Sequence, residues 1–244
     1  MNCEKRLWTA FTCCLLSICF SNARCHAQNA TDFYEPEIRE VEGWTIKLDP
    51  QLAEAENREI ADAALKSLAN HLQRIAYIVP ERRLDQLRTL PIWLELKNPV
   101  LESMQYHPSR RWLVEHGHNP DLEKHVHIPR AADLIDPGQW AKHPYVVLHE
   151  LAHAYHDQYL DFDNDEIQKV YEKARDSGGY DEVLAHDGQT VKHYGMNNAK
   201  EYFAESTEAY FGVNDFYPFV RAELRQHDPT MFALLEKIWG EIGD

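Results

Sequence analysis

Beyond Cys25 this chain of 244 residues contains no cysteine. Its five cysteines, at positions 3, 13, 14, 19 and 25, all lie at the start of the chain. Without these residues the protein could form no disulfide bond and could offer no thiolate ligand to a metal. A zinc site in the rest of the chain must therefore be built from histidine, aspartate and glutamate.

Long hydrophobic runs are also missing, apart from the mostly apolar residues 7–20. This segment is shorter than the span of about 20 apolar residues that a transmembrane helix needs. Two basic residues precede it, and small residues that include Ala23 and Ala27 follow it. This order is typical of a secretory signal peptide, residues 1–27, although a buried N-terminal helix is an alternative. We expect a secreted, periplasmic or extracellular protein with no stable membrane association.

Positive charge is scarce, because 25 lysines and arginines face 40 acidic residues and the formal net charge is −15. Residues 1–27 carry a net charge of +2, so their removal leaves −17. Such a chain is a poor partner for nucleic acids and anionic membranes, and would attract a basic substrate weakly. Internal repeats and low-complexity tracts are absent after residue 50, which favours one domain, and we expect a monomer.

The periodicity of apolar residues predicts an α+β domain over residues 51–244, preceded by a lead-in over residues 28–50. Strands are predicted at 43–48, 91–96 and 125–129, and a hairpin around Asp187-Gly188. Helices are predicted at 54–78, around 146–158 and 166–175, at 198–211 before Gly212, and near the C-terminus. We expect two lobes beside the helix around 146–158, with a mostly helical C-terminal lobe. Either 91–96 or 125–129 could be an edge strand that pairs with an extended peptide.

The sequence HELAH at residues 149–153 carries the clearest chemical signal. Residues four apart lie on one face of a helix, so His149 and His153 can bind one metal ion. Glu150 leaves the helix about 100° further round, where it can act as a general base on a water molecule. The alternative is a solvated polar helix face, but the neighbouring residues are largely apolar. HExxH thus favours a one-zinc metallohydrolase site.

A catalytic zinc site needs a third protein ligand and an open position. His156 lies near the same face, but three side chains in a row on a straight helix cannot converge on one ion. We expect His156 at the surface or supporting the site. Downstream, Glu201, Glu205 and Glu208 share a helix face, so one of them could be the ligand while a neighbour orients a histidine, or all three could form an exposed acidic stripe.

HELAH followed by YGMNNAKEYFAES at residues 194–206 resembles the catalytic domain of anthrax lethal factor and the related secreted Pro-Pro endopeptidases. In that gluzincin-type family a tyrosine lies seven residues before the ligand glutamate, in the register of Tyr194 and Glu201 here. The resemblance covers about sixty residues. It implies a zincin-like fold with His149, His153 and Glu201 as zinc ligands. It further implies Glu150 as the base, Tyr194 as the oxyanion donor and Glu205 as an acid that supports a ligand.

These residues predict a secreted zinc metalloendopeptidase that hydrolyses peptide or protein substrates. Three alternatives stay open. The chain could be a secreted zinc-binding interaction module, a metallohydrolase acting on a non-peptide substrate, or a protein with a purely structural zinc site. A structural site would usually have four protein ligands and no open position.

Overall fold

The computed structural model describes residues 33–240. The predicted signal peptide and all five cysteines lie outside the described residues. Within them, none of the helices combines the length and the apolar character that crossing a membrane would require.

A five-stranded sheet forms the N-terminal part, in the order β1-β2-β3-β5-β4. β2 (Trp44–Leu48), β3 (Ile92–Leu94) and β5 (Val126–Ile128) are parallel, and β1 (Glu37–Val41) and β4 (Gln105–Tyr106) are antiparallel edge strands. Glu42 and Gly43 both have positive φ, which suits the two-residue turn between β1 and β2. Residues expected to form a lead-in therefore belong to this sheet.

Our expectation for the edge strand is wrong. The segments 91–96 and 125–129 form the inner strands β3 and β5, each with a neighbour on both sides, and every residue of these two strands is buried. β3 (Ile-Trp-Leu) is a fully apolar run, which is typical of a strand buried on both faces, whereas β5 is buried although it contains His127. The edge beside β5 is β4, which is only two residues long.

The remaining N-terminal elements are helical. α1 (Arg58–Ile78) confirms the predicted long helix, and its buried face includes Leu68, Leu72 and Ile75. It follows two short turns, η1 (Pro50–Ala53) and η2 (Ala55–Asn57), and ends before Pro80, which cannot continue a helix. The others are α2 (Glu81–Arg88), α3 (Arg110–Glu115), η3 (Pro120–Leu122), η4 (Ala131–Ile135) and α4 (Pro137–Lys142).

The C-terminal part is almost entirely helical. α5 (Val146–Tyr155) continues into a π-helical turn, η5 (His156–Leu160), and α6 (Asp165–Ser177) follows. The predicted hairpin is confirmed as β6 (Val183–Leu184) and β7 (Thr190–Val191), and it leads through η6 (Tyr194–Asn197) to α7 (Ala199–Phe211). The chain closes with α8 (Arg221–His227) and α9 (Pro229–Trp239).

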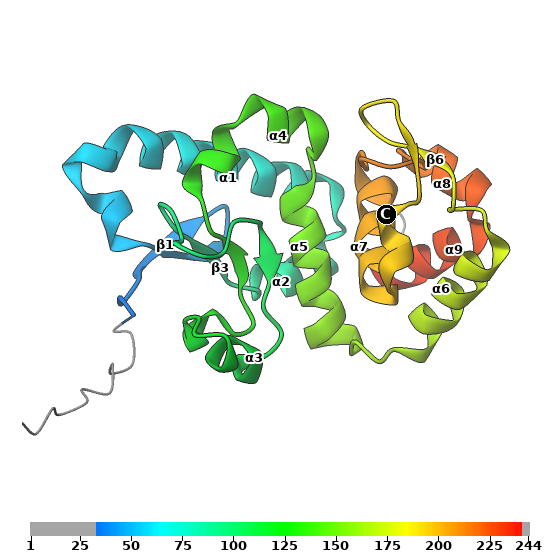
Figure 1. Ribbon diagram of the computed structural model, residues 1–244, viewed down its shortest axis with the longest axis horizontal. Helices are drawn as coiled ribbons and strands as arrows, with labels where there is room; N and C mark the ends of the chain where they lie inside the picture. Colours follow the sequence, from blue (N-terminus) through cyan, green and yellow to red (C-terminus); the bar gives the residue numbers. More distant parts are fainter. Residues whose placement is uncertain (1–32, 241–244) are drawn as a thin grey trace, which may run out of the picture. The chain divides into compact units, whose positions relative to one another are not determined.

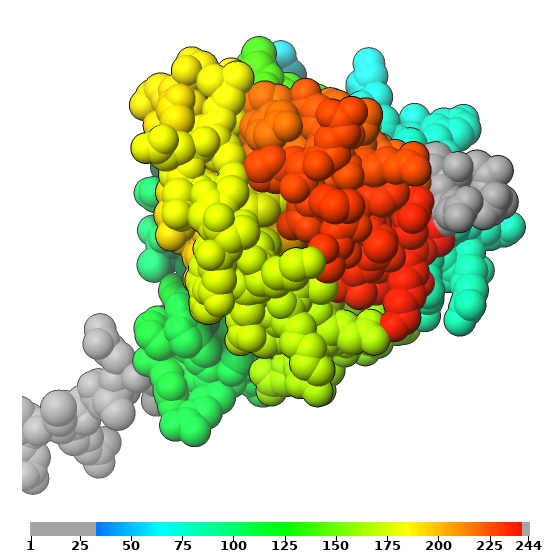
Figure 2. All heavy atoms as spheres, turned by 90° about the vertical axis from the view of Figure 1, so that its right-hand side faces the viewer, coloured from blue at the N-terminus to red at the C-terminus, as the bar shows by residue number. Residues whose placement is uncertain are grey.

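Helix α5 lies between these two parts, with the sheet, α1 and α4 on one side and α6 to α9 on the other (Figure 1). One hydrophobic core runs from the sheet through α5 to α7 and α9. Figure 2 shows the face made by the C-terminal elements, with the yellow hairpin region at one edge and the orange and red α8 and α9 near the centre. The predicted α+β class is confirmed, and the HELAH segment lies at the junction of its two parts.

Candidate metal centre

All ten residues of α5 are buried, including His149, Glu150 and His153. Such a helix is hydrophobic nearly all round, so it is stable only when other elements cover every side. α7 packs directly against it. At one end of this contact Gly212 approaches the Tyr145 ring, and a Cβ at position 212 would lie 2.2 Å from Tyr145 Cζ. Gly212 therefore ends α7, as predicted, and also permits this close packing.

The α5–α7 contact brings His149, His153 and Glu201 together. His149 Nε2 lies 3.0 Å from His153 Nε2, and Glu201 Oε2 lies 3.3 Å and 3.2 Å from these two nitrogens. Two ligands of a tetrahedral zinc ion bonded at about 2.0–2.1 Å are about 3.3 Å apart. The spacing of the three ligand atoms therefore fits one zinc ion, and three protein ligands leave a fourth position for water or substrate.

Glu201 is positioned by the start of α7. Asn198 is the N-cap of this helix, and its Oδ1 accepts hydrogen bonds of 3.0 Å from the backbone N–H groups of Lys200 and Glu201. Such a cap stabilises the first turn of a helix by about 1 kcal/mol. The candidate ligand Glu201 thus lies in the capped first turn of α7.

The electrostatics of the cluster favour a positive charge at its centre. Burial would lower the pKa of His149, but Glu201 and Glu208 raise it well above its usual range. Burial would raise the pKa of Glu201, but hydrogen bonds from His149 and His153 hold it well below its usual range. The negative groups that stabilise a proton here would also stabilise a divalent cation.

Glu150 and Tyr194 line the same cleft as the three candidate ligands. The cleft has a volume of about 760 Å³, within the range of known ligand pockets. Glu150 is 7 % exposed, whereas Tyr194 is 47 % exposed. The negative charge of Glu201, with partial burial, raises the pKa of Tyr194. Its hydroxyl therefore stays protonated and can donate a hydrogen bond to a substrate oxygen.

The expected contact between Glu205 and a ligand histidine is made by Glu208 instead, which binds His149. Glu205 Oε1 is 3.8 Å from His149 Nδ1, beyond hydrogen-bond distance, whereas Glu208 Oε1 is 2.7 Å from it. Burial and the neighbouring charge of Glu208 raise the pKa of Glu205 well above its usual range. Both glutamates are buried, which rules out the exposed acidic stripe considered from the sequence.

Contrary to the expectation from its position after HELAH, His156 is not at the surface, and its ring makes no hydrogen bond to a described residue of the site. The helix widens to a π-helical turn at this residue, and the ring is completely buried against Phe162 and Phe203. Neither ring nitrogen has a hydrogen-bond partner among residues 33–240, and burial lowers its pKa to about 4. His156 is therefore a neutral core residue.

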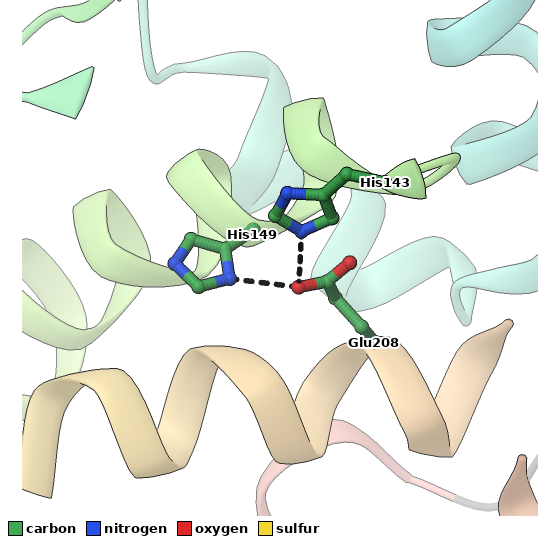
Figure 3. A group of neighbouring side chains, drawn as sticks. All are labelled: His143, His149 and Glu208. Atoms are coloured by element: carbon green, nitrogen blue, oxygen red, sulfur yellow. Dashed lines mark hydrogen bonds and ion pairs between the residues drawn. The ribbon is translucent and has the colours of Figure 1, made fainter. Parts of the chain in front are cut away.

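His143 is a polar neighbour of the site that the sequence did not reveal. It lies at the end of α4, six residues before His149, and its Nε2 lies 2.8 Å from Glu208 Oε1 (Figure 3). No local sequence motif predicts the contact between His143 and Glu208, because it depends on how the turn before α5 packs against α7. The only signal in the sequence is a histidine close to HELAH.

Comparisons with known proteins give no relative: no protein-family model, no curated protein and no solved structure matches this chain.

Proposed function

We propose that this protein is a zinc-dependent metallopeptidase with a zincin-like catalytic domain, as its resemblance to the lethal factor family implies. One observation carries the proposal. Three ligand atoms at zinc-compatible spacing share a cleft with a carboxylate suited to be a base and a tyrosine suited to be a hydrogen-bond donor. Peptide hydrolysis would then explain together the HExxH motif, Tyr194 and Glu201.

His149, His153 and Glu201 would hold one zinc ion. When bound, zinc acts as a Lewis acid and lowers the pKa of water towards about 7. Glu150 takes a proton from the attacking water and delivers it to the departing amine. The Tyr194 hydroxyl donates a hydrogen bond to the developing oxyanion, an interaction whose loss commonly lowers the rate about a hundredfold or more.

The edge strand β4 is the best candidate for binding the substrate backbone. Residues 100–106, which include β4, line one wall of the cleft. Within the described sheet β4 pairs on one side only, with β5, so its other side can pair with an extended peptide. Tyr106 donates a hydrogen bond of 2.5 Å to Asp157 in the turn after α5, which ties the strand to the helix that carries the site.

The proposal is tested with a diverse peptide library, incubated with the wild type and with Glu150→Gln while bound zinc is quantified in both. We expect equal zinc contents and cleavage by the wild type only, since the variant keeps the ligands and lacks the base. Glu182→Gln, at an exposed glutamate outside the cleft, is the matched control and should cleave normally. Zinc in both proteins with no cleavage by either would instead favour an interaction module or a non-peptide substrate.

A further inference from the structure

One carboxylate oxygen connects His149 to a second histidine. Glu208 Oε1 lies 2.7 Å from His149 Nδ1 and 2.8 Å from His143 Nε2 (Figure 3). The Glu208 side chain has no exposed surface, whereas 17 % of the His143 side chain is exposed. The three residues come from α7, α5 and the end of α4, so this contact joins three elements.

These three residues could themselves be considered a metal site, because they offer one ligand atom each within a small volume. Their distances favour hydrogen bonds instead. Ligands of a tetrahedral zinc ion lie about 3.3 Å apart, and the candidate ligand atoms of His149, His153 and Glu201 are 3.0–3.3 Å apart. The separations of 2.7 Å and 2.8 Å are typical of hydrogen bonds to a charged group, and both end on the same oxygen.

The bond to Glu208 decides which nitrogen of His149 can bind a metal. When Nδ1 donates its proton to the carboxylate, Nε2 presents its lone pair to His153 and Glu201. Glu208 must therefore stay in place for His149 to be an oriented ligand. A fully buried carboxylate is held only by its partners, and its Oε2 has none among the described residues. His143 is the second donor to its bonded oxygen.

We propose that His143 is a positioning residue, which holds Glu208 against His149 and so increases zinc affinity without touching the ion. This proposal rests on the zinc site of the proposed function, but not on peptide hydrolysis. His143 acts only through Glu208, so its effect should disappear when residue 208 can no longer accept the two hydrogen bonds.

The test measures zinc dissociation constants by competition with a chromophoric chelator. Outer carboxylate partners typically change metal affinity about 10–100-fold, so we expect Glu208→Gln to weaken zinc binding by that much. His143→Ala should weaken it less, about 3–10-fold. His143→Gln should recover most of the loss, because its amide nitrogen can replace Nε2 as donor. His186→Ala, at an exposed histidine away from the ligands, is the control.

A double variant separates positioning from a general structural effect. His143→Ala combined with Glu208→Ala should bind zinc no more weakly than Glu208→Ala alone, because without an acceptor at position 208 His143 has nothing to hold. Additive losses, or unchanged affinity in His143→Ala, would overturn the proposal. Loss of a second bound zinc ion in His143→Ala would also overturn it, in favour of a second metal site.

Thermal unfolding of the zinc-free proteins shows whether each variant folds. If Glu208→Gln fails to fold, the pair His143→Ala and His143→Gln still decides the question, because His143 is partly exposed. Zinc binding by a wild type that cleaves no peptide would refute the proposed function alone. If the wild type cleaves peptides and His143→Ala binds zinc as tightly as the wild type, only the role of His143 would be refuted.

Discussion

The hydroxyl of Tyr194 is the group in the cleft whose removal should change chemistry most selectively. The side chain is 47 % exposed, so Tyr194→Phe should leave folding and zinc content unchanged. We expect kcat to fall about 100-fold or more while KM changes little, because the hydrogen bond forms mainly in the transition state. Steady-state kinetics on a peptide found in the library screen checks this. A change in KM alone would instead indicate a role in substrate binding.

The sequence predicts the candidate site unevenly at the residue scale. The pairing of His149 with His153 follows from helical spacing, and the choice of Glu201 follows from its register with Tyr194 in the motif of the family that the sequence resembles. The division between Glu205 and Glu208 could not be predicted, because both share a helix face and their distances to His149 depend on the rotation of α7 against α5. That rotation is fixed by packing between residues far apart in the chain.

The N-cap of α7 provides a prediction at the scale of the element. Asn198→Ala removes both hydrogen bonds to the first turn, so it should lower the free energy of unfolding by about 1 kcal/mol. It should also weaken zinc binding, because Glu201 lies in that turn. Asn198→Ser keeps a capping oxygen and serves as the control. Chelator competition with both variants measures the effect, and equal zinc affinities would contradict it.

Elements with a repeating apolar pattern or a recognisable turn sequence could be predicted, and β4, which has neither, could not. The predicted helices at 54–78 and 198–211 are α1 and α7, because each repeats its apolar residues over several turns. β4 has two residues and therefore no periodicity, although it is the edge strand beside the cleft. Its place follows from the pairing of Tyr106 with Val126, twenty residues further along the chain.

Buried neutral histidines make stability depend on pH at the scale of the whole molecule. Burial lowers the pKa of His71, His125 and His156 to about 4 and that of His107 and His193 to about 3. In the unfolded chain each would bind a proton below about pH 6.5. The unfolded state therefore binds more protons between about pH 6.5 and 4, so this contribution to stability falls as the pH falls.

The variant His71→Phe removes the pH-dependent contribution of one of these histidines. The phenyl ring can keep the stacking on Trp140, whose centroid is 4.0 Å from that of His71, but it does not titrate. The free energy of unfolding of the metal-free variant minus that of the wild type should be about 2–3 kcal/mol larger at pH 4.5 than at pH 7. Urea denaturation at both pH values measures this change. A difference that does not vary with pH would contradict it.

Secretion would leave the whole molecule without cysteine. If residues 1–27 are removed, the mature protein should begin at residue 28, and iodoacetamide should add no mass to it after unfolding. Intact-mass spectrometry of the exported protein checks both points. Any alkylated species would show that part of the cysteine-containing segment is retained.

The most direct test of the account is a crystal of the zinc-loaded protein, with diffraction recorded on both sides of the zinc absorption edge. We expect one anomalous peak per chain, about 2.0–2.2 Å from Nε2 of His149, Nε2 of His153 and the carboxylate of Glu201. A peak between His143 and Glu208, or none beside His149 and His153, would contradict the assignment of the metal centre.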